Sequence, residues 1–250
     1  MTLRLLAGAG LVLCCAAAVA APAAPAAKPA RSAAASGTSA TAGTAGTAQD
    51  VPPVTLLASV GGKGAGGKAL DPVFAQLQLP RMACTFSEEK QVALLARPLR
   101  SSGTLLFDRE RGVFRATVKP RPSQVLLTPT ALRITKGGKT EEIALDKSKD
   151  LRAFVLVFPA LLRGDRAQLE RSFELRLFGR GQDWWALRLS PRAKSLRSLV
   201  SRVVVVGHEH QLVSLEVTEA SGDVTRTRLS ELRVGEQVTD DEIAAAFGAR

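Results

Sequence analysis

Short runs of alternating apolar and polar residues constrain the fold of this chain more than any other feature. The first pair covers residues 103–108 and 113–118, and the turn-like segment 108–112, which contains a glycine, joins them. Alternation over four to eight residues is typical of a half-buried β-strand, because successive side chains point to opposite faces. Two such runs around a glycine-containing turn predict a β-hairpin with one apolar face.

Similar runs recur as far as residue 229, so about ten antiparallel strands are expected. No period of 20 to 50 residues repeats, which excludes a solenoid or a propeller. The further runs are expected at residues 125–127, 131–135, 141–145, 172–178, 184–189, 199–206, 211–218 and 224–229.

The middle of the chain has a different period. Large apolar residues recur there at helical spacing and predict one strongly apolar helix at 150–162, which Pro159 kinks or ends because proline lacks a backbone N–H. The segment 165–171 is expected to add a further helical turn. The residues with helical spacing are Leu151, Phe154, Val155, Phe158, Leu161 and Leu162.

Two short helices are expected nearer the ends of the chain. Asp71 and Pro72 are typical of an N-cap and a first helical position, which predicts a helix at 71–79, and another is expected at 240–247. The fold class is therefore mainly β with a few helices, built on a single curved antiparallel sheet. The apolar helix at 150–162 must bury its stripe against that sheet, which predicts a concave apolar interior filled by a helix.

The N-terminus has the pattern of a secretory signal at residues 1–20. Arg4 supplies a positive charge, residues 5–18 are almost wholly apolar, and a small-x-small cleavage site follows. A membrane anchor is the alternative, but the apolar run is shorter than the roughly 20 residues that span a bilayer. Lipidation of Cys14 or Cys15 is a third reading, although the residues before them fit a lipobox poorly.

Residues 21–68 are rich in Ala, Pro, Gly, Ser and Thr and have few large apolar residues, so a flexible tether is expected there. The folded domain is then expected at 69–250, which is long enough for one substantial core. After cleavage of the signal one cysteine would remain, Cys84. It could form no internal disulfide, and its apolar neighbours predict a small buried hydrophobic residue.

The formal net charge of +11 and the pI near 10.3 predict an anionic partner. Export makes nucleic acid a poor candidate, and an aromatic content of 4% with no tyrosine supplies few stacking platforms for bases. An anionic lipid headgroup or an acidic protein fits better. A basic surface that is simply solvated is the alternative.

Catalytic and metal-binding patterns are weak throughout. Two histidines flank Glu209 at 208–210, but a metal site needs three or four ligands. The serines at 101–102 have no nearby histidine, and the segment 136–139 lacks the spacing of a phosphate-binding loop. The acidic pair at 88–89 is expected at the surface. No enzyme activity, metal or cofactor is therefore expected.

The order of several short motifs over residues 70–248 resembles the LolA-type family of periplasmic lipoprotein carriers, in particular its divergent LolA-like branch. The signal and the N-terminal helix come first, and the motifs follow. They comprise a Phe-x-Glu-x-Lys strand at 86–90, Ser-Gly-x-Leu-x-Phe at 102–107, Trp-x-Leu-x-Leu-x-Pro at 185–191, Leu-Glu at 215–216 and Gly-Asp-x-Thr at 222–225.

This resemblance implies an incomplete antiparallel half barrel whose apolar cavity is covered by lid helices. Alternation within the strands supplies the cavity candidates, although the same residues would equally suit an ordinary core. The candidates on the first hairpin are Leu105, Phe107, Phe114, Ala116 and Val118, those on a later strand are Phe173, Leu175 and Leu177, and those on the lid are Leu151, Phe154, Phe158 and Leu161.

The resemblance also implies a latch. In the family, an arginine of the first hairpin hydrogen-bonds to the lid, and it normally precedes proline and an apolar-aromatic pair. Here Val113-Phe114 matches that pair, but the proline is missing, so either Arg109 or Arg111 could serve. The alternative is that both arginines lie in a solvated turn.

The function expected from the resemblance is a monomeric periplasmic carrier. It would take the acyl chains of a lipoprotein, a glycolipid or another lipidated cargo from an inner-membrane donor complex to an outer-membrane receptor. A non-catalytic interaction module of an envelope assembly is the second hypothesis. A periplasmic hydrolase or acyltransferase with an unrecognised site is the third.

Overall fold

The computed structural model describes residues 64–179, 184–209 and 211–248. The expected signal at 1–20, with Cys14 and Cys15, and the tether up to residue 63 lie outside the described residues. Ordered structure includes the end of the segment expected as a tether, because Ala65 pairs with Leu177 in a β-bridge and the 3-10 helix η1 covers Gly67–Leu70.

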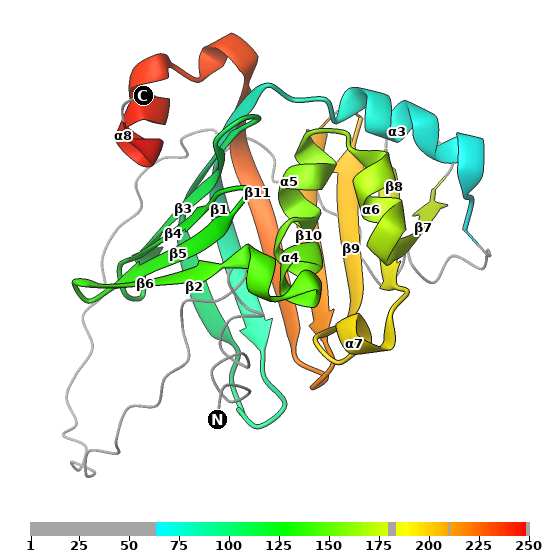
Figure 1. Cartoon of the computed structure of the whole chain (residues 1–250), viewed down its shortest axis with the longest axis horizontal. Helices are drawn as coiled ribbons and strands as arrows, with labels where there is room; N and C mark the ends of the chain where they lie inside the picture. The colour runs from blue at the N-terminus through cyan, green and yellow to red at the C-terminus, as the bar shows by residue number, and fades with distance from the viewer. Residues whose placement is uncertain (1–63, 180–183, 210, 249–250) are drawn as a thin grey trace, which may run out of the picture.

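The described residues form one sheet of eleven antiparallel strands, which confirms the predicted fold class (Figure 1). The strands are β1 (Arg81–Gln91), β2 (Leu99–Asp108), β3 (Gly112–Lys119), β4 (Ser123–Leu127), β5 (Ala131–Lys136), β6 (Lys139–Ala144), β7 (Phe173–Phe178), β8 (Trp184–Pro191), β9 (Val200–His208), β10 (Gln211–Glu219) and β11 (Val224–Val234).

The sheet is two meanders joined at their first and last strands. Strands β1 to β6 follow one another outward in one direction, β11 to β7 follow in the other, and β1 pairs antiparallel with β11 at the centre. The edge strands β6 and β7 do not meet, so the sheet is not closed into a barrel. Register shifts interrupt the β1–β11, β2–β3 and β9–β10 pairings, and such bulges increase local twist and bending.

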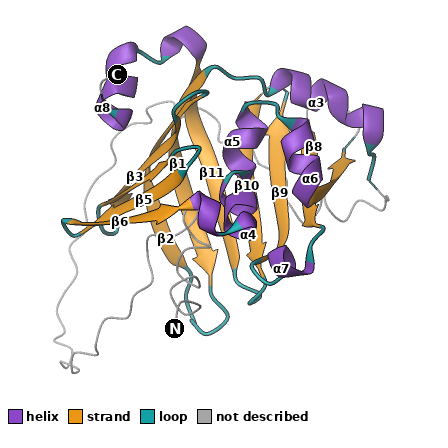
Figure 2. Ribbon diagram, in the orientation of Figure 1, coloured by secondary structure: helices purple, strands orange, loops and turns teal. Residues whose placement is uncertain are grey.

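Helices lie over the sheet: α5 and α6 lie side by side across one face, and α4 lies below α5 in Figure 2. The apolar side chains of these three helices and of the strands beneath them belong to one buried cluster. The helices are α3 (Asp71–Gln76), α4 (Lys149–Val155), α5 (Val157–Leu162), α6 (Arg166–Ser172), α7 (Lys194–Arg197) and α8 (Asp240–Phe247), with short 3-10 turns η2 (Leu145–Lys147) and η3 (Gly235–Gln237).

The apolar helix predicted at 150–162 is in fact two helices, α4 and α5, which meet at Leu156. Pro159 explains the break, because proline removes an N–H and its ring clashes with the carbonyl four residues earlier, at Val155. Helix α4 ends at that residue. A polar side chain caps the N-terminus of α4 and of α6. The Ser148 hydroxyl accepts a hydrogen bond from the Leu151 N–H at the start of α4, and the Asp165 carboxylate accepts one from the Gln168 N–H at the start of α6.

Helix α8 covers the opposite face of the sheet. Its Ile243 packs with Ala83 of β1 and with Val238 in a separate small cluster. The rings of Phe247 and of Phe114 in β3 pack edge to face, with their centroids 6.4 Å apart. The Thr239 hydroxyl and the Glu242 carboxylate form a capping box that starts the helix. Both faces of the β1–β3 region are therefore covered, one by the C-terminal helix and the other within the larger cluster.

Candidate functional site

The face of the sheet beneath α4 to α6, called here the inner face, carries most of the predicted cavity residues. Leu105, Phe107, Phe173 and Leu175 are buried in the large apolar cluster, and Leu177 is partly buried and packs against it. In β7 the exposed Glu174 alternates with these residues, as strand geometry requires. One apolar surface thus extends across strands from both meanders.

Three of the predicted cavity residues lie on the other face, and their assignment to the cavity was wrong. Phe114, Ala116 and Val118 alternate out of phase with Leu105, since the β2–β3 register pairs Leu105 with Arg115. Opposed residues of paired strands share a face, so Val113, Arg115 and Thr117 line the inner face of β3. Val118 is 58% exposed, and Phe114 instead packs on α8.

All four predicted lid residues are buried against the inner face. Leu151 and Phe154 come from α4, Phe158 and Leu161 from α5, and each belongs to the same cluster as the strand residues beneath. Leu161 is fully buried. Helices α4, α5 and α6, called here the lid, therefore share a continuous apolar core with the sheet, and in this arrangement they cover the inner face themselves.

One end of the lid is fixed by three contacts. A guanidinium nitrogen of Arg109, in the β2–β3 turn, donates to the carbonyl of Arg163 at 3.0 Å, and the Leu79 N–H donates to the Leu162 carbonyl at 2.9 Å. Gly164 has a φ of +67°, and a Cβ there would lie 2.7 Å from the Phe74 carbonyl. Burial lowers the pKa of the Arg163 guanidinium, and the charge of Arg109 acts in the same direction.

The two arginines of the hairpin turn have different partners. Arg111 donates to the carbonyl of Gly248, at the end of α8, at 2.7 Å, whereas Arg109 reaches the end of α5. Sequence patterns alone left the choice between them open, and the geometry brings Arg109 to the lid.

An ion pair joins the lid to the N-terminal helix. Arg166 of α6 lies 2.5 Å from the Asp71 carboxylate of α3 and 2.8 Å from Glu170 of α6. Helix α3 thus contacts the lid through charge as well as through the close approach at Gly164. The break between α4 and α5, by contrast, lies at Leu156.

A buried charged group interrupts the apolar inner face. Glu88, which was predicted at the surface, is buried there, so that prediction was wrong. The Glu88 carboxylate lies 3.1 Å from an Arg115 guanidinium nitrogen and accepts from the hydroxyls of Thr227 and Ser101. The Arg115 guanidinium also stacks 4.0 Å over the Phe86 ring. Burial raises the pKa of Glu88, and Arg115 and the hydroxyls act against that shift without cancelling it.

The alternation in β1 contains a signal that could have revealed this group. Met82, Cys84 and Phe86 are buried on the inner face, and the same period continues through Glu88 to Lys90. Lys90 is buried too, and its ammonium lies 2.8 Å from the Glu219 carboxylate. The inner face therefore changes from apolar to charged along β1.

The histidine pattern at 208–210 gains no support as a metal site. The His208 ring lies against the Trp184 ring, with centroids 4.5 Å apart and planes tilted by 52°, and His210 lies outside the described residues. Among residues 64–179, 184–209 and 211–248, no group of three or more His, Cys, Asp and Glu side chains could hold a metal ion. None of the helices in these ranges has the length and apolar character needed to cross a bilayer.

Cys84 is expected to be nearly inert in the folded protein. Its thiol lies in the core cluster beneath the lid, and burial raises its pKa to about 12. With Cys14 and Cys15 replaced by serine, modification of Cys84 by Ellman's reagent at pH 8 should be about a thousandfold slower than that of a free cysteine, since the thiolate is the nucleophile. In 6 M urea the rate should rise to the free value; equal rates in both conditions would contradict this burial.

Comparison with known proteins shows which family shares this architecture. The family described as outer membrane lipoprotein carrier protein LolA-like matches residues 65–247, almost all of the sheet and its helices. The chain belongs to this family. The LolA-like match begins at the Ala65 bridge and ends in α8, so it includes the lid and both arginines of the hairpin turn. No curated protein matches the sequence.

Three solved structures are examples of proteins with a similar fold. The LolA superfamily protein NE2245 from Nitrosomonas europaea is 10% identical, with a TM-score of 0.38, and the alignment covers 69% of this chain and 96% of that one. A DUF1329 family protein from Desulfovibrio piger is 13% identical, with a TM-score of 0.39 and coverages of 71% and 96%. The chain in the Pseudomonas aeruginosa MucA/MucB complex is 16% identical, with a TM-score of 0.36 and coverages of 70% and 58%.

Proposed function

We propose that this LolA-like chain is a carrier that shields the acyl chains of a lipidated cargo between the inner face of the sheet and the lid. The observation that carries this proposal is the lid itself. Its apolar side chains are continuous with the core of the sheet, while its polar contacts with the hairpin turn and with α3 cluster at one end. Membership of the LolA-like family supports the same function.

Burial of an acyl chain and burial of the lid side chains have similar free energies, so cargo can replace the lid on the inner face. Each buried CH₂ of an acyl chain is worth about 0.8 kcal/mol, and burial of a Leu or Phe side chain about 1.5–3 kcal/mol. An acyl chain that displaces Phe154, Phe158 and Leu161 from the inner face replaces one set of apolar contacts with another. The net free energy of loading is then small compared with either term, so cargo can be taken up and released without covalent chemistry.

The proposed location is the periplasm. The signal pattern at residues 1–20 and the family both support export, and the proposed partners are a donor at the inner membrane and a receptor at the outer membrane. Leu156 provides the place at which the lid would bend, because the helical hydrogen bonding of α4 ends there and α5 begins anew.

Native mass spectrometry of the full chain tests the carrier proposal. The probe is a synthetic lipopeptide with two acyl chains, and the control is the same peptide without them. We expect one lipopeptide bound per chain and no binding of the bare peptide. An unchanged mass with both would reject the carrier function and favour the interaction module of an envelope assembly.

A further inference from the structure

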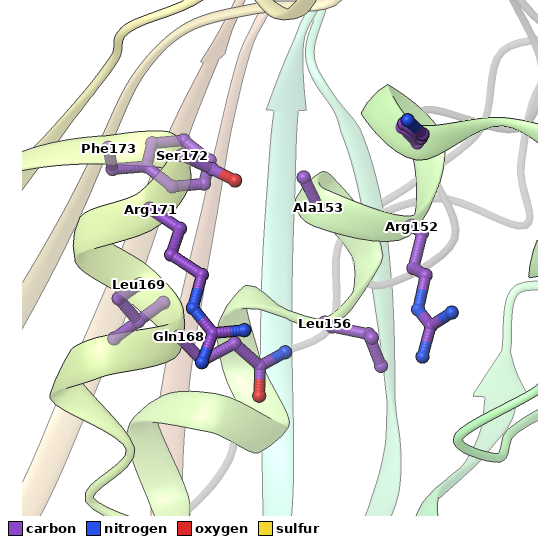
Figure 3. Close-up of a pocket in the computed structure, with 9 residues that line it drawn as sticks. Arg152, Ala153, Leu156, Gln168, Leu169, Arg171, Ser172 and Phe173 are labelled. Carbon is purple, nitrogen blue, oxygen red and sulfur yellow. The ribbon is translucent and has the colours of Figure 1, made fainter.

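A cavity of about 350 Å³ lies within the lid, between α4 and α6 (Figure 3). Its apolar wall is formed by the buried side chains of Leu156, Leu169 and Phe173, all members of the core cluster beneath the lid. Leu156 is also the residue at which α4 ends and α5 begins. The cavity therefore opens beside the break between α4 and α5, and its wall continues into the apolar interior.

Three cationic side chains line this cavity. Arg152 of α4 and Arg171 of α6 lie on its two sides in Figure 3, and Lys149 also lines it. In the part of the chain that the structure describes, none of these three forms a salt bridge, whereas the neighbouring Arg166 of α6 pairs with two carboxylates. Three cations therefore share this opening without an acidic side chain to neutralise them.

The remaining polar groups at the cavity are hydrogen-bonding side chains without formal charge. The Ser172 hydroxyl and the Gln168 amide line it, and the Gln168 amide oxygen accepts from Arg163 at 3.4 Å. No carboxylate lines the cavity. An apolar wall beneath a mouth of cations and neutral donors matches an amphiphile with an anionic head.

We propose that this cavity binds the phosphate-bearing headgroup of a membrane lipid, with the first methylenes of its acyl chains on Leu156, Leu169 and Phe173. The inference rests on the proposed carrier function and names the class of amphiphile that the lid admits. Arginine suits this role because its planar guanidinium can donate two parallel hydrogen bonds to phosphate. The volume is at the low end for ligand cavities, which fits a headgroup and the start of its chains.

The position of the cavity gives the headgroup a mechanical role. A phosphate held by Arg152 and Arg171 contacts both α4 and α6, the first and the last helix of the lid. Its acyl chains would point along the cavity wall toward the residues that the lid buries. Binding of the head therefore places the chains where they can compete with the lid for the inner face.

Binding of short-chain lipids to the full chain tests this site. The probes are dihexanoyl phosphatidylglycerol and dihexanoyl phosphatidylcholine, used below their micelle concentrations, together with inorganic phosphate, and the measurement is isothermal titration calorimetry at low salt. We expect the anionic lipid to bind at least tenfold more tightly than the zwitterionic lipid, and inorganic phosphate to bind more weakly than either. Equal affinity for the two lipids would overturn the proposal, and phosphate binding as tight as that of the anionic lipid would show a free-anion site instead.

The double variant Arg152→Gln, Arg171→Gln should lose the preference for the anionic lipid. Both side chains are exposed, so the variant should fold, and Arg100→Gln, Arg133→Gln provides a control with the same charge change on exposed arginines elsewhere. A preference retained in the first variant, or lost equally in the control, would overturn the site. If the wild type discriminates between the lipids but takes up no acylated lipopeptide, the carrier function fails and the headgroup site stands.

Discussion

Replacement of Arg115 by methionine, with Glu88 left in place, is expected to lower the free energy of unfolding by about 3–5 kcal/mol. The change removes the guanidinium 3.1 Å from a carboxylate that is 4% exposed. Thr227 and Ser101 still donate to Glu88, but neutral donors compensate a buried charge less well than a cation. Urea unfolding followed by the fluorescence of Trp184 and Trp185 measures the effect.

The matched control is Arg133→Met, which breaks a cross-strand pair with Glu142 whose two side chains are both about half exposed. Exposed pairs contribute about 0–1 kcal/mol, so this variant should remain close to the wild type. The double variant Glu88→Met, Arg115→Met should recover most of the lost stability, because neither charge of this pair remains buried without its partner. A double variant as unstable as Arg115→Met alone would show that packing, rather than charge, dominates at this position.

The same variant should respond to pH in a definite direction. Burial raises the folded-state pKa of Glu88 above its unfolded value, so the folded state binds more protons in the window between the two. Stability contributed by Glu88 is therefore lost as pH rises through that window. Arg115→Met removes a group that lowers this pKa, so its penalty should be smaller at pH 5 than at pH 8. A penalty independent of pH would mean that Arg115 does not shift the folded-state pKa of Glu88.

The sequence predicted where the strands lie along the chain. It did not always predict which residues of a strand point to the inner face of the sheet. The alternation at 103–108 and 113–118 predicted β2 and β3, which pair as a hairpin. The shared face depends on the turn, however, and the pairing of Asp108 with Gly112 puts odd-numbered residues opposite one another. With this register, Arg115 lies on the inner face of the sheet and Phe114 lies on the opposite face. A turn one residue longer or shorter would have reversed the outcome, and alternation alone does not specify it.

In the candidate site, too, features set by neighbouring residues could be predicted, and contacts between residues far apart in the sequence could not. The apolar stripe of the lid followed from helical spacing, and Pro159 indicated a break in the helix. The buried pair of Glu88 and Arg115 joins β1 to β3 across β2, and the contact between Arg109 and Arg163 joins residues 54 positions apart. Contacts of this kind depend on the tertiary fold. For Arg109 and Arg111, which are two residues apart in one turn, only the fold determines which of them reaches the lid.

Loss of the Arg109 side chain is expected to open the lid more often. Arg109→Ala removes the hydrogen bond to the Arg163 carbonyl, and a charged hydrogen bond contributes about 1.5–3 kcal/mol. This bond is exposed, so the lower value applies, and about 1.4 kcal/mol corresponds to a tenfold change in an equilibrium constant. Cys84, buried in the cluster that contains the lid residues, reports the opening through its rate of modification, which should rise about tenfold.

The matched control for this variant is Arg111→Ala, which removes a guanidinium from the same turn but releases α8 on the opposite face. The modification rate of Cys84 in this variant should stay within about twofold of the wild-type rate. A twofold difference corresponds to a change of less than about 0.5 kcal/mol in the free energy of lid opening. The measurement uses chains in which serine replaces Cys14 and Cys15. Local opening also has a signature in urea: the rate in Arg109→Ala should depend only weakly on low urea concentrations, because lid opening exposes far less surface than unfolding. Equal Cys84 rates in the two variants, or a urea dependence as steep as that of global unfolding, would remove Arg109 from the role of lid latch.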